Sequence, residues 1–240
     1  MVNNESFFSL VGFGANGWGA ILLSGVAVTL AASLSGLVLG LLIGTLGAWA
    51  KIAGGRFIRA LADTYTTVLR GVPDLLVIYL FYFGSSTVLT AIAGYFGKQG
   101  FFALPGFMAG TIAIGVIAGA LSTEVLRGAF QVVSQGELDA AKAYGMRFFQ
   151  RFRRIVTPLT LRHALPGLGN VWLGLLKESS LLSVTGVAEL MRQAQVGSGS
   201  TRMPFNFFLA AAVLYVVMAS LSGLIVHFTE RHYARGARRA

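Results

Sequence analysis

The chain has 240 residues, of which 55% are hydrophobic and 12% are charged, with a net charge of +10 and no cysteine. Soluble domains carry about 25% charged residues, so this composition excludes an ordinary soluble domain. The lack of cysteine excludes a disulfide framework, a zinc site built from thiolates and a dithiol redox motif. We expect no metal site and no catalytic residue in this chain.

Long apolar blocks predict helices that cross a membrane, because about 20 apolar residues cover the hydrocarbon core of a bilayer. We predict an all-α integral membrane fold in one transmembrane domain, residues 1–240, with five spans. The first apolar block is too long for a signal peptide and is expected to stay in the protein. The five spans are placed near 20–49, 74–95, 105–127, 165–182 and 204–226.

Basic residues gather in three segments of the chain. Of the 19 Lys and Arg residues, fifteen follow the first, third or fifth span, in 51–70, 127–162 and 231–239. Because Lys and Arg accumulate on the cytoplasmic side, we predict an outer N-terminus and an inner C-terminus. The basic excess then reflects topology and anionic lipid headgroups, and nucleic acid is not an expected partner.

Small residues recur at every fourth position of the first span. They are Ala32, Gly36, Gly40, Gly44 and Ala48, and the third span adds Gly115 and Gly119. Such spacing lets helix backbones approach closely in lipid. Packing within this chain and contact with a second subunit both fit the pattern, and we favour packing within the chain.

The most polar part of the chain lies between the third and fourth spans. Ser134 and Glu137 fit a capping box, and Asp139 adds negative charge to the first turn, where the helix dipole favours it. Gly145 fits the left-handed residue that ends a helix. We therefore predict a helix over 135–144, too short and too polar to span a membrane.

An amphipathic run comes directly after this short helix. Aromatic and aliphatic residues recur at helical spacing from Phe148 to Val156, with four arginines among and beside them. That pattern is typical of a helix lying at the inner leaflet. Pro158 is expected to stop or kink it.

The same residues fit a longer pattern: Asp139-Ala140-Ala141, three residues, Gly145, nine residues, Ile155, two residues and Pro158. This resembles the EAA loop of ABC-importer permeases, with Asp139 in place of Glu and Thr157 in place of Leu. The resemblance implies a cytoplasmic loop over about 131–162 whose coupling helix docks on a separate ATPase. The implied ATPase-coupling residues are Glu137, Asp139, Ala140, Ala141, Gly145 and Pro158.

The resemblance covers most of the chain. Residues 64–84, 122–145 and 161–186 look like the core of polar amino-acid permeases. The stretch "QAQVGSGSTRMPFNFF", residues 193–208, is similar to the external loop of one subgroup. That subgroup holds the Q-type subunits of histidine and lysine/arginine/ornithine importers and of octopine and nopaline importers.

This resemblance implies the translocation subunit of an ATP-driven ABC type I importer for polar, basic amino acids or opines, working by alternating access. The implied partners are a homodimeric ATP-binding subunit, a second permease that is a paralogue, and a periplasmic amino-acid-binding protein. The implied location is the bacterial inner membrane. No G-x-x-x-x-G-K-S/T motif occurs, so we expect ATP and Mg²⁺ on the ATPase and no cofactor on this chain.

Ionisable residues inside a span are candidates for function. Glu124 and Arg127 are expected to pair, and a helix break is predicted from Arg70 to Asp74, where Asp74 can cap the next helix. The substrate-path candidates are Glu178, Ser179, Ser180, Lys177, Asp74 and Glu124. Structural roles as ion pairs or caps stay open for all of these charged residues.

Two other functions have weaker support in the sequence. A secondary transporter or channel acting without an ATPase would predict inverted repeats and would not need a capped docking helix. "VGSGST" at 196–201 suggests a serine hydrolase, but a hydrolase needs a histidine base within reach. The three histidines lie on the predicted inner side, whereas this stretch is predicted to be an external loop.

Overall fold

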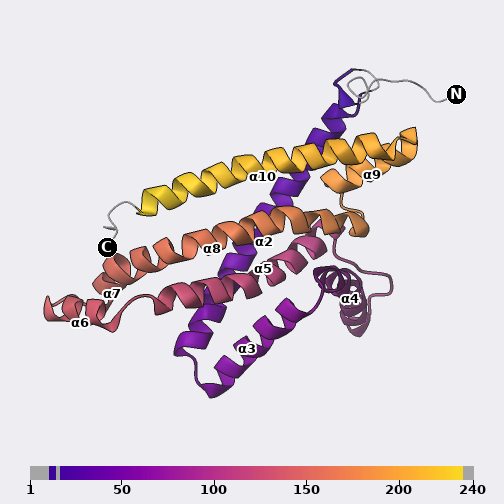
Figure 1. Cartoon of the computed structure of the whole chain (residues 1–240). Coiled ribbons are helices and arrows are strands. Elements are labelled where there is room, and N and C mark those ends of the chain that lie inside the picture. Colours follow the sequence, from indigo (N-terminus) through magenta and orange to yellow (C-terminus); the bar gives the residue numbers. More distant parts are fainter. Residues whose placement is uncertain (1–10, 15–16, 235–240) are drawn as a thin grey trace. The chain divides into compact units, whose positions relative to one another are not determined.

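The computed structural model describes residues 11–14 and 17–234, and these residues form helices and no strand (Figure 1). The α-helices are α2 (Gly19–Ala53), α3 (Arg56–Gly71), α4 (Asp74–Tyr95), α5 (Gly106–Gln131), α6 (Gln135–Ala143), α7 (Phe148–Arg151), α8 (Thr157–Glu178), α9 (Leu190–Thr201) and α10 (Pro204–Ala234). A π-helix, η1 (Phe152–Val156), joins α7 to α8, and a 3-10 helix, η2 (Ser179–Thr185), comes after α8.

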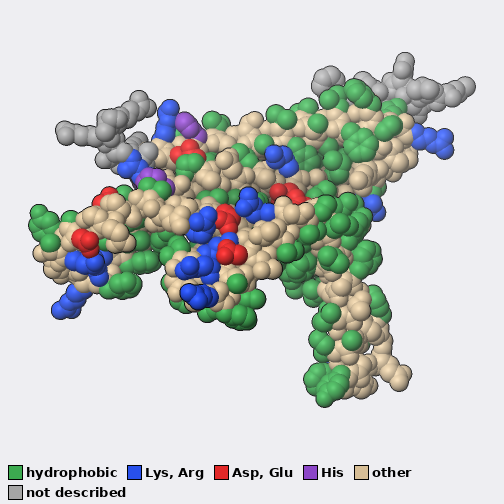
Figure 2. Space-filling view, turned by 60° about the horizontal axis from the view of Figure 1, so that its bottom comes forward, with side chains coloured by type: hydrophobic (Ala, Val, Ile, Leu, Met, Phe, Trp, Pro, Cys, Tyr) green, Lys and Arg blue, Asp and Glu red, His purple; other side chains and the backbone are tan. Residues whose placement is uncertain are grey.

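Four helices of the described chain are long and apolar enough to cross a membrane: α2, α4, α5 and α10. Helix α4 has the bounds predicted for the second span. The other three continue by four to eight residues beyond their predicted inner ends, because backbone hydrogen bonding persists after the apolar stretch has ended. Figure 2 shows hydrophobic side chains over much of the visible face, with charged side chains in a few places.

The fourth predicted span, 165–182, corresponds to α8 but is not among these four helices. Helix α8 ends at Glu178, inside the polar run from Lys177 to Ser180, and the tighter helix η2 takes over. Gly186 then adopts a left-handed conformation with φ of 81°. The number of spans therefore stays a prediction.

Pro158 was predicted to stop or kink the helix, and the stop is wrong, whereas the kink stays a prediction. Helical structure runs through Pro158, with η1 directly before it and α8 beginning at Thr157. A proline ring clashes with the carbonyl of the residue four positions earlier in an α-helix, here Arg154. The wider i to i+5 spacing of a π-helix relieves that clash, so the chain stays helical.

The chain forms two compact units, each built from three separate segments. The first unit holds the described residues of Met1–Gly36, Pro73–Gly115 and Gly174–Ser220, and the second those of Leu37–Val72, Val116–Leu173 and Leu221–Ala240. The expectation of one transmembrane domain remains a prediction.

Each unit has its own apolar core. In the first unit, the rings of Trp18 and Phe207 meet edge to face at 5.4 Å, and the buried residues are Leu22, Leu190, Ala194, Phe207, Ala210, Ala211 and Met218. In the second unit, Ala48 of α2 is buried with Leu126 and Ala129 of α5 and Ala164 of α8. The small residues here let the helices approach closely, since hydrocarbon itself does not drive helices together.

The small-residue stripe of α2 is buried within this chain. A Cβ added at Gly36 would lie 2.9 Å from the Ile114 side chain of α5 in the first unit. In the second unit, a Cβ added at Gly44 would lie 2.5 Å from the Cβ of Ser122, also in α5. The interpretation of the stripe as packing within the chain is therefore supported over a subunit interface.

The segment predicted as an external loop at 196–201 is helical. It forms the second half of α9, and Arg202 comes next in a left-handed conformation with φ of 57°. The three small residues Ser198, Gly199 and Ser200 were taken as loop residues, but tertiary packing overrides such weak local preferences.

Gly36→Val is expected to lower the midpoint of thermal unfolding in detergent, because the added side chain would overlap Ile114. Overpacking of this kind destabilises a protein by about 1–3 kcal/mol. Gly84→Val is the matched control, since no heavy atom lies within 4 Å of a Cβ built at Gly84. An equal loss in both variants would show that close approach at Gly36 does not hold α2 and α5 together.

Candidate functional site

The capping box at the start of α6 is confirmed. The Glu137 N–H donates to Ser134 Oγ at 3.2 Å, and the Ser134 N–H donates to Glu137 Oε2 at 3.0 Å. Two backbone donors that the helix leaves without partners are thereby satisfied. The short polar helix thus has a fixed first turn in this chain alone.

The predicted end of α6 is also confirmed. Gly145 has φ of 73°, which a glycine adopts without steric cost. Its N–H donates to the Lys142 carbonyl oxygen at 2.8 Å, and the Met146 N–H donates to the Ala141 carbonyl oxygen at 3.1 Å. These two bonds form the Schellman motif, so both ends of α6 are closed by local interactions.

The two alanines of α6 face different surroundings. Ala141 is 4% exposed and packs within the chain, whereas Ala140 is exposed. Asp139 is exposed and pairs with Lys142 at 2.6 Å. A partner can therefore contact Asp139 and Ala140 directly, whereas Ala141 packs α6 onto the rest of the chain.

Exposed aromatic side chains lie just beyond α6. Tyr144, Phe148 and Phe149 are 87%, 76% and 69% exposed. Figure 2 shows hydrophobic side chains beside charged ones at the end of the second unit that carries α6. Large apolar side chains grouped on a surface indicate contact with a partner or with lipid.

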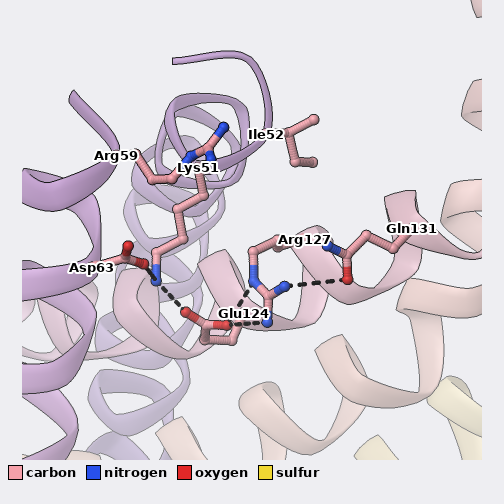
Figure 3. Close-up of a pocket in the computed structure, with 7 residues that line it drawn as sticks. All are labelled: Lys51, Ile52, Arg59, Asp63, Glu124, Arg127 and Gln131. Atoms are coloured by element: carbon pink, nitrogen blue, oxygen red, sulfur yellow. Dashed lines mark hydrogen bonds and ion pairs between the residues drawn. The ribbon is translucent and has the colours of Figure 1, made fainter. Parts of the chain in front are cut away.

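An ionic cluster around a buried lysine joins α2, α3 and α5 in the second unit (Figure 3). The side chain of Lys51 is 6% exposed, and its Nζ lies 2.5 Å from Glu124 Oε1 and 2.8 Å from Asp63 Oδ1. The same Nζ donates to Thr66 Oγ1 at 2.7 Å. Two hydrogen bonds, to Glu124 and Thr66, and the ion pair with Asp63 offset the desolvation of the charge.

The predicted pair of Glu124 and Arg127 is confirmed as part of this cluster. Glu124 Oε2 accepts from Arg127 Nε at 2.9 Å and lies 2.9 Å from Nη2. Arg127 Nη1 donates to Gln131 Oε1 at 3.2 Å, which extends the chain of contacts to the last residue of α5.

Sequence reasoning missed Lys51 and Asp63 as members of this cluster. Lys51 was counted only as a topological charge, and Asp63 is separated from Glu124 by 61 positions in the sequence. One pattern could have found Lys51, because it lies three residues after Ala48 on the small-residue stripe of α2. A charge on a helix face that packs closely against a neighbour needs a buried partner.

Helix α3 has a second polar anchor. The Tyr65 hydroxyl donates to the Val116 carbonyl oxygen of α5 at 2.6 Å. Burial raises the pKa of Tyr65 to about 12, so the hydroxyl keeps its proton and remains a donor at neutral pH. Tyr65 and Thr66 thus fix α3 from adjacent positions.

A polar cavity of about 480 Å³ opens beside the ionic cluster (Figure 3). Its lining residues are Lys51, Ile52, Arg59, Asp63, Glu124, Arg127 and Gln131. Within residues 11–14 and 17–234, no group of three His, Asp or Glu side chains lies close enough to hold a metal ion.

The helix break from Arg70 to Asp74 is confirmed, since α3 ends at Gly71 and α4 begins at Asp74. The residue at the N-cap of α4 is Pro73, however, and Asp74 is the first helical residue. The expectation that Asp74 caps α4 is therefore wrong, and its carboxylate is left for other contacts.

Glu178 ends α8 in the first unit, as Asp74 begins α4. Helix α4 packs against η2, the helix that follows directly after Glu178. Glu178 Oε2 is buried without a hydrogen-bond partner in the described part of the chain. Of the substrate-path candidates, Asp74, Lys177, Glu178, Ser179 and Ser180 belong to the first unit, whereas Glu124 belongs to the ionic cluster of the second.

The neighbouring serines use their hydroxyl hydrogens locally. Ser179 Oγ donates to the Leu176 carbonyl oxygen at 2.8 Å, and Ser180 Oγ donates to that of Lys177 at 2.6 Å. Ser179 is fully buried, and Lys177 is exposed. Glu178 is therefore the member of this run with an unused polar atom.

The fully buried Glu189 was missed by sequence reasoning. It caps α9 by accepting from the N–H groups of Met191 and Arg192 at 2.8 Å and 2.7 Å. The Tyr215 hydroxyl donates to it at 3.0 Å. The signal was an acidic residue directly before a helix, which was hidden because the helix was predicted as a loop.

Comparison with known proteins shows the family to which this chain belongs. Residues 36–239 match the family of binding-protein-dependent transport system inner membrane components. The chain belongs to this family, and its resemblance to ABC-importer permeases is confirmed.

Relatives align over nearly their full length. The chain is 50% identical to the octopine transport system permease protein OccQ of Rhizobium meliloti, covering 97% of this chain and 98% of that protein. It is 43% identical to the nopaline transport system permease protein NocQ of Agrobacterium fabrum, covering 96% of this chain and 98% of that protein. It is 38% identical to the histidine/lysine/arginine/ornithine transport system permease protein HisQ of Salmonella typhimurium, covering 93% of this chain and 98% of that protein.

Solved structures share the fold. A crystal structure of an amino acid ABC transporter with histidines gives a TM-score of 0.78 at 29% identity, covering 95% of this chain and 99% of that chain. An inward-facing MetNI methionine ABC transporter gives 0.69 at 19% identity, covering 91% and 98%. The fold is that of an ABC type I importer permease, as the sequence predicted.

Ser134→Ala is expected to loosen α6, since the loss of an N-cap costs about 1 kcal/mol of helix stability. Amide hydrogens of α6 should then exchange roughly fivefold faster in a hydrogen-exchange measurement. Ser134→Asn, which keeps a capping oxygen, is the control and should exchange like the wild type. Unchanged exchange in Ser134→Ala would contradict the role assigned to the capping box.

Proposed function

We propose that this chain is the translocation subunit of an ATP-driven importer for basic amino acids or opines in a bacterial inner membrane. The observation that carries the proposal is α6, a helix closed at both ends by its own residues and exposed at Asp139 and Ala140. A nine-residue helix is marginal alone in water, so its two caps indicate a surface kept in shape for a partner. The relatives' names supply the substrate class.

The proposed mechanism is alternating access driven by a separate ATPase. Closure of the ATPase displaces α6, and only Val132, Val133 and the cap Ser134 separate α6 from α5. Both ends of this short link are held, because the Val133 N–H donates to the Phe130 carbonyl oxygen and Ser134 belongs to the capping box. Displacement of α6 therefore passes to α5 rather than being lost in a flexible loop.

The proposed complex contains a homodimeric ATP-binding subunit that holds ATP and Mg²⁺, a second permease that is a paralogue, and a periplasmic binding protein. Membership of a binding-protein-dependent family supports the last of these. The similarity to Q-type subunits such as OccQ and HisQ supports the paralogous pair.

We assign the cationic group of the substrate to Glu178, with Asp74 adding negative charge nearby. A buried carboxylate oxygen without a partner is costly, and a guanidinium or ammonium group entering the path would satisfy it. This assignment rests on the unused Oε2 of Glu178. Ser179 and Ser180 then hold the end of α8 rather than the substrate.

Ala140→Trp is expected to reduce recovery of the ATPase with the tagged chain from solubilised membranes by about tenfold, because added bulk at a packed contact costs about 1–3 kcal/mol. Ala60→Trp, at another exposed helical alanine, is the control. Ala141→Trp is not a clean test, since Ala141 is buried in this chain.

Equal recovery of the ATPase with Ala140→Trp and with wild type would exclude α6 as the docking helix. Recovery of the wild-type chain without any ATPase would instead favour a transporter that acts alone.

Glu178→Gln is expected to weaken the preference of the assembled importer for arginine over its uncharged analogue citrulline by about tenfold, the value of one charge-assisted hydrogen bond. The measurement is competition between the two amino acids for uptake into proteoliposomes that contain all subunits. Glu230→Gln, at the end of α10, is the control. An unchanged preference in Glu178→Gln would exclude Glu178 as the cation site.

A further inference from the structure

A continuous set of contacts in the second unit runs from Gln131 at the end of α5, through the ionic cluster around Lys51, to α3. Gln131 ends α5, and its side chain accepts from Arg127. Arg127 pairs with Glu124, and Glu124 pairs with Lys51. Lys51 in turn contacts Asp63 and Thr66 of α3.

Burial decides whether these contacts can transmit movement. The Lys51 side chain is 6% exposed, so separating its ammonium from Glu124 would leave a buried charge whose remaining carboxylate partner is the exposed Asp63. That separation is strongly unfavourable. The exposed pair of Lys142 and Asp139 can open at little cost, because water replaces the lost contact. The C-terminal end of α2 is therefore tied to the middle of α3 and to α5, whereas the exposed ion pair of α6 opens freely.

Helix α3 is held through polar groups on neighbouring positions. Asp63 and Thr66 face Lys51, and Tyr65 donates to the Val116 carbonyl oxygen of α5. In contrast, Phe57, Ile58 and Leu61 on another face of α3 are exposed. Movement of α5 is thus imposed on α3 by specific charged and polar contacts, not by a broad apolar interface.

We propose that Lys51 is a positioning residue that passes movement of α6 and α5 on to α3, through Glu124 on one side and Asp63 on the other. The proposal rests on the proposed function, because it needs an ATPase that moves α6. Helix α3 leads directly into the break at Gly71–Pro73 before α4, so this contact sets how the inner part of the path responds to ATP. Loss of Lys51 uncouples ATP hydrolysis from import while leaving ATP hydrolysis in place.

The test compares Lys51→Met with wild type in proteoliposomes that contain the complete importer, and measures the ATP hydrolysed per substrate molecule imported. The ratio is expected to rise at least about fivefold, the lower end of typical coupling between sites. Lys98→Met, an exposed lysine outside the helices, is the matched control and should keep the wild-type ratio. A parallel fall of import and hydrolysis, or an unchanged ratio, overturns the proposal.

A double variant separates transmission from stability. Lys51→Met with Glu124→Met replaces the central pair by apolar side chains, a change that proteins often tolerate without loss of stability. The charges that lose a partner, Asp63 and Arg127, are 57% and 35% exposed, so water replaces the lost contacts. We expect its unfolding temperature to return towards that of wild type while the ratio stays high. If the double variant restores both the unfolding temperature and the ratio, Lys51 only stabilises the fold and the proposal is overturned.

The wild-type complex distinguishes failure of the Lys51 proposal from failure of the proposed function. If the wild-type complex imports with ATP and Lys51→Met keeps the same ratio, only the role of Lys51 is lost. If the wild-type complex shows no ATP-dependent import, the proposed function fails and the role of Lys51 fails with it.

Discussion

The ammonium of Lys51 is held by Glu124, Asp63 and Thr66, because its side chain is only 6% exposed and its charge needs partners within the chain. That requirement fixes the C-terminal end of α2 against α3 and α5, where Glu124 is shared between Lys51 and Arg127. The bond from Tyr65 to α5 adds a second anchor beside it. The small residues of α2 contribute the close approach that brings these groups within reach, as at Gly44 and Ser122.

The proposed docking helix, α6, is stabilised by local hydrogen bonds and not by a buried charge. Helix α6 depends on local hydrogen bonds at its two ends rather than on burial, and only Ala141 anchors it to the chain. An exposed helix that keeps its shape is suited to a partner that binds and releases. The three-residue link from α6 to α5 then connects the exposed docking surface to the ionic cluster around Lys51.

Much of this arrangement could be predicted from local sequence. The capping box at Ser134, the turn at Gly145, the break before Asp74 and the pair of Glu124 with Arg127 all depend on residues within four positions of one another. The partners of Lys51 and the bond from Tyr215 to Glu189 join residues distant in the sequence, and no local pattern specifies them. At Pro158 the local rule was applied correctly, but a π-helix removed the clash on which it rests.

The central claim is that this chain moves its substrate only when an ATPase drives it. The most direct measurement is accumulation of labelled octopine or arginine in proteoliposomes containing this chain, its second permease, the ATPase and the binding protein. We predict accumulation with ATP and none when the ATPase is left out, whatever proton or sodium gradient is imposed. Accumulation driven by a gradient without the ATPase would contradict the claim and would establish a secondary transporter instead.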